Sequence, residues 1–96
     1  MKNKIYCVSK ALNHRTKHGT NGLDWSNSMS KCFDSREEAE VFYESIVSEF
    51  DFDKYTTKEY KYNICLYEPI ITKNGHVLSI PGKTLKSDAY SGSYFT

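Results

Sequence analysis

The spacing of apolar residues between positions 35 and 50 predicts one amphipathic helix. Ser35 can cap the free N–H groups of the first turn, and Glu38 can complete a capping box with it. Asp34 paired with Glu37 is the alternative cap. At about 100° per residue, one side of this helix collects the apolar side chains Ala39, Phe42, Tyr43, Ile46, Val47 and Phe50. This period is typical of a helix that lies on a sheet.

Alternating residues before the helix predict two strands joined by a long connection. Residues 4–12 form the first strand, and residues 28–34 form the second. The segment between them is polar and is interrupted at His18-Gly19 and at Asn21-Gly22. The Asn-Gly pair is a strong turn signal because both residues tolerate positive φ. On the first strand one face carries Tyr6, Val8 and Leu12, and the other carries Ile5, Cys7, Ser9 and Ala11. These features predict a β-hairpin with an irregular tip.

The chain after the helix predicts two further strands and a tight turn. Residues 60–68 alternate well and form the third strand. Pro69 follows this strand and marks a bulge, a bend or a sheet edge, because proline donates no ladder hydrogen bond. Residues 70–78 then predict a hairpin around Asn74-Gly75.

The C-terminal segment predicts a tail. Pro81-Gly82 ends the hairpin, and residues 83–96 are rich in Ser, Gly and Tyr with no apolar period. We therefore expect one domain over residues 1–82 and a tail without regular structure over residues 83–96. The alternative for the tail is a peptide that docks on a partner or on the sheet.

These elements predict an α+β fold in the order β-β-α-β-β. About four strands form an antiparallel sheet, and the amphipathic helix packs on one face of it. A single helix in a chain of 96 residues cannot cover both faces of such a sheet. The second face is therefore polar, or it is covered by a second copy, by a different protein or by the aromatic residues of the tail, Tyr90, Tyr94 and Phe95.

The net charge of +1 conceals an uneven distribution. Residues 1–33 carry +5, residues 34–59 carry −6 and residues 60–96 carry +2. We interpret this as an ordinary solvated surface, with a molecule that has a basic side and an acidic side as the alternative. Lysine outnumbers arginine eleven to two. This ratio disfavours nucleic acid as the first partner, because arginine is the residue suited to bidentate phosphate contacts.

The cysteines Cys7, Cys32 and Cys65 lie within apolar runs, and no two of them share a CxxC spacing. We expect free, buried thiols in a reducing cytoplasm, because an odd number would leave one thiol unpaired in a secreted chain. A zinc site with added histidine ligands is the less favoured alternative, since no metal-ligand spacing is present. The first residues lack the apolar core of a signal peptide, and no apolar run reaches the roughly twenty residues of a membrane span.

The sequence offers no catalytic constellation. The cysteines lie in predicted strands, where thiols are usually inert, and there is no serine elbow and no Gly-rich phosphate loop. Paired carboxylates gather only on the helix surface. We therefore expect a protein that is not an enzyme and that holds no metal and no cofactor.

Two segments are predicted to bind a partner. The loop at residues 13–25 holds His14, Arg15, Lys17 and the only tryptophan, Trp25, and Trp and Arg often dominate binding energy at interfaces. The alternative is that Trp25 packs on the hairpin and that the basic residues are merely solvated. The second segment is the outer helix face, which could meet a basic nucleic-acid-binding groove and consists of Glu37, Glu40, Val41 and Glu44.

Residues 29–50 resemble part of a known group of proteins. Phe33-Asp34-Ser35 leads into Glu37 and the single amphipathic helix, which is similar to the small phage-borne inhibitors of bacterial defence systems, the anti-CRISPR proteins among them. The frequent Lys, Asn, Tyr and Ser residues fit a low-GC bacterium or its phages. The resemblance implies a small ββαβ domain that inhibits by occupying a surface of a larger complex, and it supplies no residue-level motif.

Three functional hypotheses follow from the sequence. The leading one is a cytoplasmic, non-enzymatic protein-binding module of phage or mobile-element type, whose partner is a larger bacterial protein or ribonucleoprotein complex. The second is a nucleic-acid-binding regulator that uses the basic N-terminal hairpin. The third is a small-ligand-binding dimer with a pocket at the interface between two copies.

Overall fold

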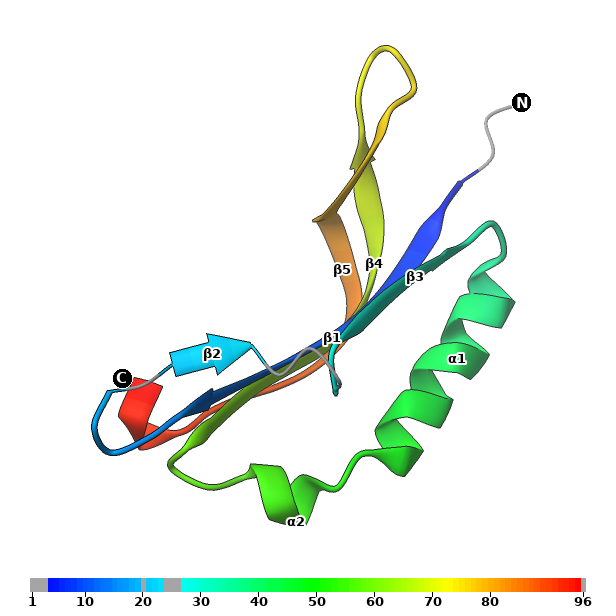
Figure 1. Cartoon of the computed structure of the whole chain (residues 1–96). Coiled ribbons are helices and arrows are strands. Elements are labelled where there is room, and N and C mark those ends of the chain that lie inside the picture. The colour runs from blue at the N-terminus through cyan, green and yellow to red at the C-terminus, as the bar shows by residue number, and fades with distance from the viewer. Residues whose placement is uncertain (1–3, 20, 24–26, 96) are drawn as a thin grey trace.

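The computed structural model describes residues 4–19, 21–23 and 27–95 (Figure 1). In chain order, the elements are β1 (Tyr6–Arg15), β2 (Asn21–Leu23), β3 (Met29–Phe33), α1 (Arg36–Glu49), α2 (Phe52–Tyr55), β4 (Tyr60–Ile71), β5 (Val77–Ser91) and a final 3₁₀ helix, η2 (Ser93–Phe95). Within the described residues every strand pairing is antiparallel, and α1 lies across one face of a curled sheet (Figure 1). The predicted α+β fold is confirmed.

The sheet is organised around β1. One side of β1 pairs with β4, which in turn pairs with β5. The other side of β1 is shared between two short strands, because β3 pairs with residues 6–10 and β2 pairs with residues 13–15. The sheet is therefore at most four strands across.

The N-terminal connection differs from the sequence prediction. The predicted turn at Asn21-Gly22 is wrong, because both residues belong to β2 and pair with the end of β1. The chain turns at residues 16–19, which include the other predicted break, His18-Gly19. Gly19 has a φ of 86°, and its N–H donates to the Thr16 carbonyl at 3.0 Å. A strand of three residues is too short to show a hydrophobic period, so the pattern could not reveal it.

Helix α1 begins where the sequence predicts. The Ser35 hydroxyl oxygen accepts a hydrogen bond from the Glu38 N–H at 3.4 Å, so Ser35 is the N-cap. Ala39 and Tyr43 are buried, and the rest of the predicted apolar stripe packs against the same core. On the sheet side this core consists of Val8, Leu12, Tyr62, Ile64 and Leu66. The predicted packing of the helix on the sheet is confirmed.

Polar contacts join α1 to β5. The Tyr43 hydroxyl donates to Asp88 Oδ2 at 2.5 Å, and Lys86 Nζ lies 3.0 Å from Glu44 Oε1 and 3.7 Å from Glu40 Oε2. Burial raises the pKa of Tyr43, and the hydrogen bond to Asp88 raises it further, because both favour the neutral phenol. These contacts join β5 to α1, the helix that packs on β1 and β4.

The face of the sheet that α1 leaves uncovered carries mainly small and polar side chains. The strand register places its members in two rows, Ser9 with Cys65 and Ser87, and Ala11 with Asn63 and Ala89. One buried cluster of Cys7, Cys65 and Tyr67 lies on this face beside those rows. Tyr90, one of the tail residues expected to cover this face, packs on the α1 side of the sheet instead.

Two of the three cysteines are joined, which corrects the expectation of free thiols. Cys7 and Cys32 form a disulfide between β1 and β3, where the two residues lie directly opposite each other with Cα atoms 4.0 Å apart. Cys7 and Cys32 are 25 residues apart in the sequence. Nothing in the sequence shows that two cysteines so far apart lie opposite each other on paired strands. Cys65 is the free cysteine; it is buried, and its Sγ lies 3.2 Å from Ser9 Oγ.

The C-terminal segment also differs from the prediction. Pro81-Gly82 does not end the hairpin, and residues 83–91 are not a structureless tail, because β5 continues through them and pairs with β4, with one register shift at Leu85. Tyr90 stacks on Tyr62 with ring centroids 5.7 Å apart on the α1 side of the sheet. This segment is a strand because its backbone pairs with β4. Its side chains are mostly polar, so its sequence shows no alternation of apolar and polar residues from which a strand could be predicted.

Replacing Tyr43 with Phe removes the hydroxyl that bonds Asp88 and keeps the ring in the core. We expect the free energy of unfolding at pH 7 to fall by about 1–3 kcal/mol, the usual range for losing a hydrogen bond to a charged group. The folded pKa of Tyr43 lies above the value of about 10 in the unfolded chain, so its stabilisation is complete below pH 10 and declines as the pH rises further. The gap in stability between wild type and Tyr43→Phe should therefore be constant up to about pH 10 and narrow as the pH rises above that value, as measured by urea denaturation.

Tyr90→Phe is the matched control for this experiment. Its hydroxyl donates to the Thr57 carbonyl at an exposed site, so the change should lower stability less than Tyr43→Phe does. A Tyr43→Phe protein as stable as wild type at pH 7 would show that the contact with Asp88 contributes nothing.

Candidate functional site: a projecting apolar arm

The distal halves of β4 and β5 leave the body of the sheet as a two-stranded ribbon (Figure 1). We call residues 69–82 the arm. The pairing of β4 with β1 ends at Cys7 opposite Tyr67, so among the described residues the arm strands pair only with each other. The projection lengthens the molecule to 51 × 28 × 20 Å, and the radius of gyration of 14.9 Å exceeds the value of about 12.5 Å for a compact chain of this length.

The arm carries an exposed aliphatic surface. Within the described part of the chain six large aliphatic side chains are exposed, and five of them belong to the arm. Between 39% and 51% of each of these five side chains is accessible to solvent, and they are Ile70, Ile71, Val77, Leu78 and Ile80. An apolar patch gathered on one feature marks an interaction site more often than a scattered exposed side chain does.

Proline and glycine shape the base of the arm. Pro69 lies opposite Pro81, and the register of the β4–β5 ladder shifts on both sides of Pro69. Neither proline can donate a ladder hydrogen bond, and bulges bend the strands that carry them. Gly82 completes the base, because a Cβ there would approach the Glu68 carbonyl oxygen and Ile70 Cγ1 to 3.2 Å. The prediction that Pro69 marks a bulge is confirmed, and it sets the arm at an angle to the sheet.

The tip of the arm is the hairpin that the sequence predicts. Gly75 has a φ of 83°, and its N–H donates to the Thr72 carbonyl at 2.9 Å. The Thr72 N–H donates to the His76 carbonyl at 2.9 Å, and the His76 N–H donates to the Thr72 hydroxyl oxygen at 3.1 Å. Between Pro69 and Lys83 the sequence holds Lys73, His76 and Lys83 but no Asp or Glu. The arm is therefore apolar along its length, with basic residues and no acidic ones.

The basic residues predicted to bind a partner lie at the opposite end of the molecule from α1. His14 and Arg15 end β1, and Lys17 is exposed in the turn that follows. His14 Nε2 lies 2.9 Å from Glu59 Oε1, and the His14 ring stacks on Tyr60 with centroids 4.8 Å apart. His14 therefore already has partners within the chain. Trp25 lies outside the described residues, so its predicted role stays a prediction.

The predicted acidic surface divides into two parts. Glu40 and Glu44 both contact Lys86, and Glu40 also lies 3.1 Å from Arg36, so cations of the same chain neutralise these two carboxylates. The hydrogen bond to Glu44 in turn raises the pKa of Lys86. Glu37 and Val41 face solvent beside a shallow hollow of about 490 Å³, whose other lining residues are Phe33, Glu38, Phe42 and Ser45.

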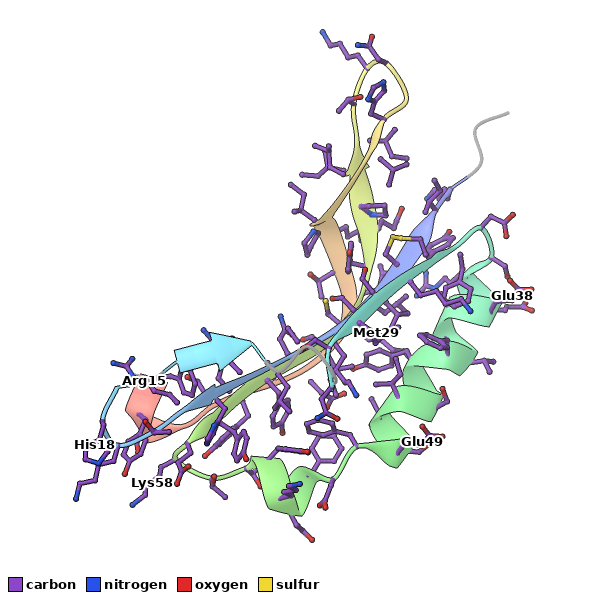
Figure 2. All side chains as sticks on the ribbon, viewed as in Figure 1. Arg15, His18, Met29, Glu38, Glu49 and Lys58 are labelled. Carbon is purple, nitrogen blue, oxygen red and sulfur yellow. A yellow bond between two sulfur atoms is a disulfide. The ribbon has the colours of Figure 1, made fainter. Side chains whose placement is uncertain are left out.

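The two predicted surfaces are not brought together. Figure 2 shows Arg15 and His18 at one end of the molecule and Glu38, at the start of α1, at the other. The arm is a third feature, separate from both (Figure 1). Sequence reasoning found its hairpin but missed its exposure. The available signal was two pairs of adjacent aliphatic residues, Ile70-Ile71 and Val77-Leu78, on both sides of a five-residue connection. Neighbours in a strand point to opposite faces, so one covering layer cannot bury both members of such a pair.

Other chemistry gives no competing site in the residues that the structure describes. Among them no group of three or more His, Cys, Asp or Glu side chains could hold a metal ion. None of the described helices has the length and apolar character needed to cross a membrane. No protein family, no curated protein and no solved structure matches this chain. The exposed aliphatic residues of the arm are therefore the feature from which a function is inferred.

Amide hydrogen exchange tests the physical state of the arm in the isolated protein. A ribbon of two strands with half-exposed side chains is marginally stable in water, so it should open locally without unfolding the sheet. The Thr72 N–H donates to the His76 carbonyl, so the next hydrogen-bonded pair along the ladder is Ile70 with Leu78. We expect the amides of Ile70 and Leu78 to exchange at least about 100-fold faster than those of Ile64 and Leu66, which lie in the core. Equal protection in the arm and in the core would show that the arm is not a separate, weakly held unit.

Proposed function

We propose that this protein is a non-enzymatic protein-binding module, which inserts its arm into an apolar groove on a larger protein or ribonucleoprotein complex and blocks the surface around it. The observation that supports the proposal is the exposure of five aliphatic side chains on one projecting ribbon. Burying such surface is the main favourable term in protein association. Steric blocking of a partner's surface requires only that the bound protein covers it, so this function does not require a catalytic group.

The charge of the arm indicates the character of the groove. Lys73 at the tip and Lys83 at the base flank the aliphatic surface, and no carboxylate lies between them. A groove with an apolar floor and an acidic rim would complement both features. The aliphatic side chains would supply the buried centre of the interface, and the lysines would lie in its solvated rim.

The resemblance of residues 29–50 to small phage-borne inhibitors suggests a bacterial defence complex as the target. In this proposal the protein acts in the cytoplasm of the bacterial host cell. Cellular thiols keep cysteine pairs reduced there, and in that state β3 is held by its backbone pairing with β1 over five residue pairs. The arm lies in β4 and β5, so docking does not depend on the Cys7–Cys32 bond.

A double substitution on the arm tests the proposal. Ile71→Ser with Ile80→Ser changes the two most exposed side chains of the arm, and neither belongs to the core clusters. We expect the variant to fold and to lose at least about 100-fold in affinity, since truncating a central interface residue commonly weakens binding by more than 1 kcal/mol. Tagged wild type and variant would be used to capture partners from host lysate, with mass spectrometry and absorbance at 260 nm as readouts, and calorimetry with the purified partner would follow.

Val41→Ser is the matched control. Val41 is an aliphatic residue exposed to 71%, it lies on α1 away from the arm, and it belongs to the acidic surface predicted from the sequence. The control should retain full affinity. Loss of binding with Val41→Ser and not with the arm variant would assign docking to α1 instead. Nucleic acid as the sole captured component would favour a nucleic-acid-binding regulator, and recovery of the bare wild-type protein would contradict the proposal.

A further inference from the structure

The hollow beside α1, which we call the α1 hollow, combines an apolar floor with exposed carboxylates. The half-buried rings of Phe33 and Phe42 form its floor, with ring centroids 5.3 Å apart. Around them lie the exposed residues Val41, Glu37 and Glu38. The volume of about 490 Å³ lies within the range of about 300–1,000 Å³ that is typical of ligand pockets. The α1 hollow therefore has room for side chains of another molecule.

The charges at the α1 hollow are not neutralised within the chain. The carboxylates farther along α1 are paired with Lys86, whereas no cation of the described residues lies within ion-pair distance of Glu37 or Glu38. Asp34 lines an adjoining hollow together with Glu38 and is also exposed. Lys31 adds one positive charge, because its Nζ lies 5.3 Å from the centroids of both phenyl rings of the floor. The α1 hollow therefore keeps a net negative charge.

The arm has the complementary surface. Its exposed aliphatic side chains lie on a ribbon whose charged residues are all basic. Ile70 lies directly opposite Leu78, so these two side chains share one face of the ribbon. Among the described residues no carboxylate pairs with Lys73 or Lys83. An apolar groove with an acidic rim complements such an arm, and this chain itself carries one.

We propose that the arm of one copy of this chain docks in the α1 hollow of a second copy. Figure 1 shows the arm and α1 on opposite sides of the sheet, so the arm does not enter the hollow of its own copy. In this contact the aliphatic side chains of the arm cover Phe33, Phe42 and Val41, which removes apolar surface from water. The lysines of the arm then lie near Glu37 and Glu38, and opposite charges across the contact select this orientation.

This contact joins two different surfaces, so it is heterologous. A copy whose arm is docked still offers its own α1 hollow to a further copy. A single ribbon buries less than about 1,200 Å², which is typical of weak and transient contacts. We therefore expect separate copies at low micromolar concentration and association toward about 1 mM.

The contact uses the same arm as the function proposed above, but it does not require that function. Because one arm fills one groove at a time, self-association competes with a larger partner, and only this consequence rests on the proposed function. Val41→Ser leaves the arm intact. It should therefore weaken the contact between copies without lowering the affinity for the larger partner.

Two variants that each lose one surface test the contact by light scattering coupled to gel filtration at high loading concentration. Ile71→Ser with Ile80→Ser removes the arm surface. Val41→Lys places a cation at the α1 hollow, on a helix residue that is exposed to 71%, so the helix should form as before. Neither variant should self-associate. A mixture retains one intact arm and one intact hollow, so it should form a complex of twice the chain mass of 11.1 kDa and no larger species.

Ser48→Lys is the matched control. It adds the same charge to α1 at an exposed position two turns from Val41, outside the residues that line the hollow. This variant should self-associate like the wild type. Equal loss of association in Ser48→Lys and Val41→Lys, or a mixture that stays at 11.1 kDa, would overturn the proposal.

Amide chemical shifts of ¹⁵N-labelled wild type locate the contact without any substitution. Between about 10 µM and 1 mM, the amides of Val41 and Ser45 at the hollow should shift together with those of Ile70 and Leu78 on the arm. Shifts confined to the arm would indicate contact between two arms and would contradict the proposal, as would spectra that do not change with concentration. Both experiments use purified protein alone, so their results do not depend on whether a larger partner exists.

Discussion

The antiparallel register between β1 and β4 is the constraint on which the rest of the structure depends. It places Val8 opposite Leu66 and Leu12 opposite Tyr62, so the two central strands present one apolar face to α1. The outer strands build on this pair, β3 beside β1 and β5 beside β4. β1 has 10 residues, whereas β4 has 12 and β5 has 15, and the β1–β4 pairing ends at Tyr67. The longer strands therefore continue alone, and the arm is a direct result of that difference in length.

The parts of the fold that the sequence could predict are those set by local chemistry. The Ser35 cap and the helix stripe need only neighbouring residues, and the hairpin at Gly75 needs only a positive φ. The parts that it could not predict depend on pairing between distant segments. The short strand β2 pairs with β1, the polar second half of β5 pairs with β4, and the disulfide joins β1 to β3. None of these pairings leaves a local pattern in the sequence.

The same distinction applies to the candidate site. Sequence reasoning selected residues by type, so it chose the aromatic and basic loop and the carboxylates of α1. The structure pairs His14 with Glu59 and pairs Glu40 and Glu44 with Lys86, which leaves less of those surfaces free than their composition suggests. The aliphatic residues of the arm look like ordinary strand residues in the sequence. Their exposure is a tertiary property, because no third strand and no helix of the described residues covers residues 69–82.

The central claim is that the arm is the part of the molecule that meets a partner protein. Photo-crosslinking inside host cells tests it most directly, with a benzophenone side chain placed at Leu78 on the arm and, for comparison, at Val41 on α1. Both positions are exposed in the isolated chain, so neither probe should disturb the core. The account predicts that Leu78 yields one dominant adduct with a host protein and that Val41 yields little or none. Equal adducts from the two positions, or an adduct from Val41 alone, would contradict it.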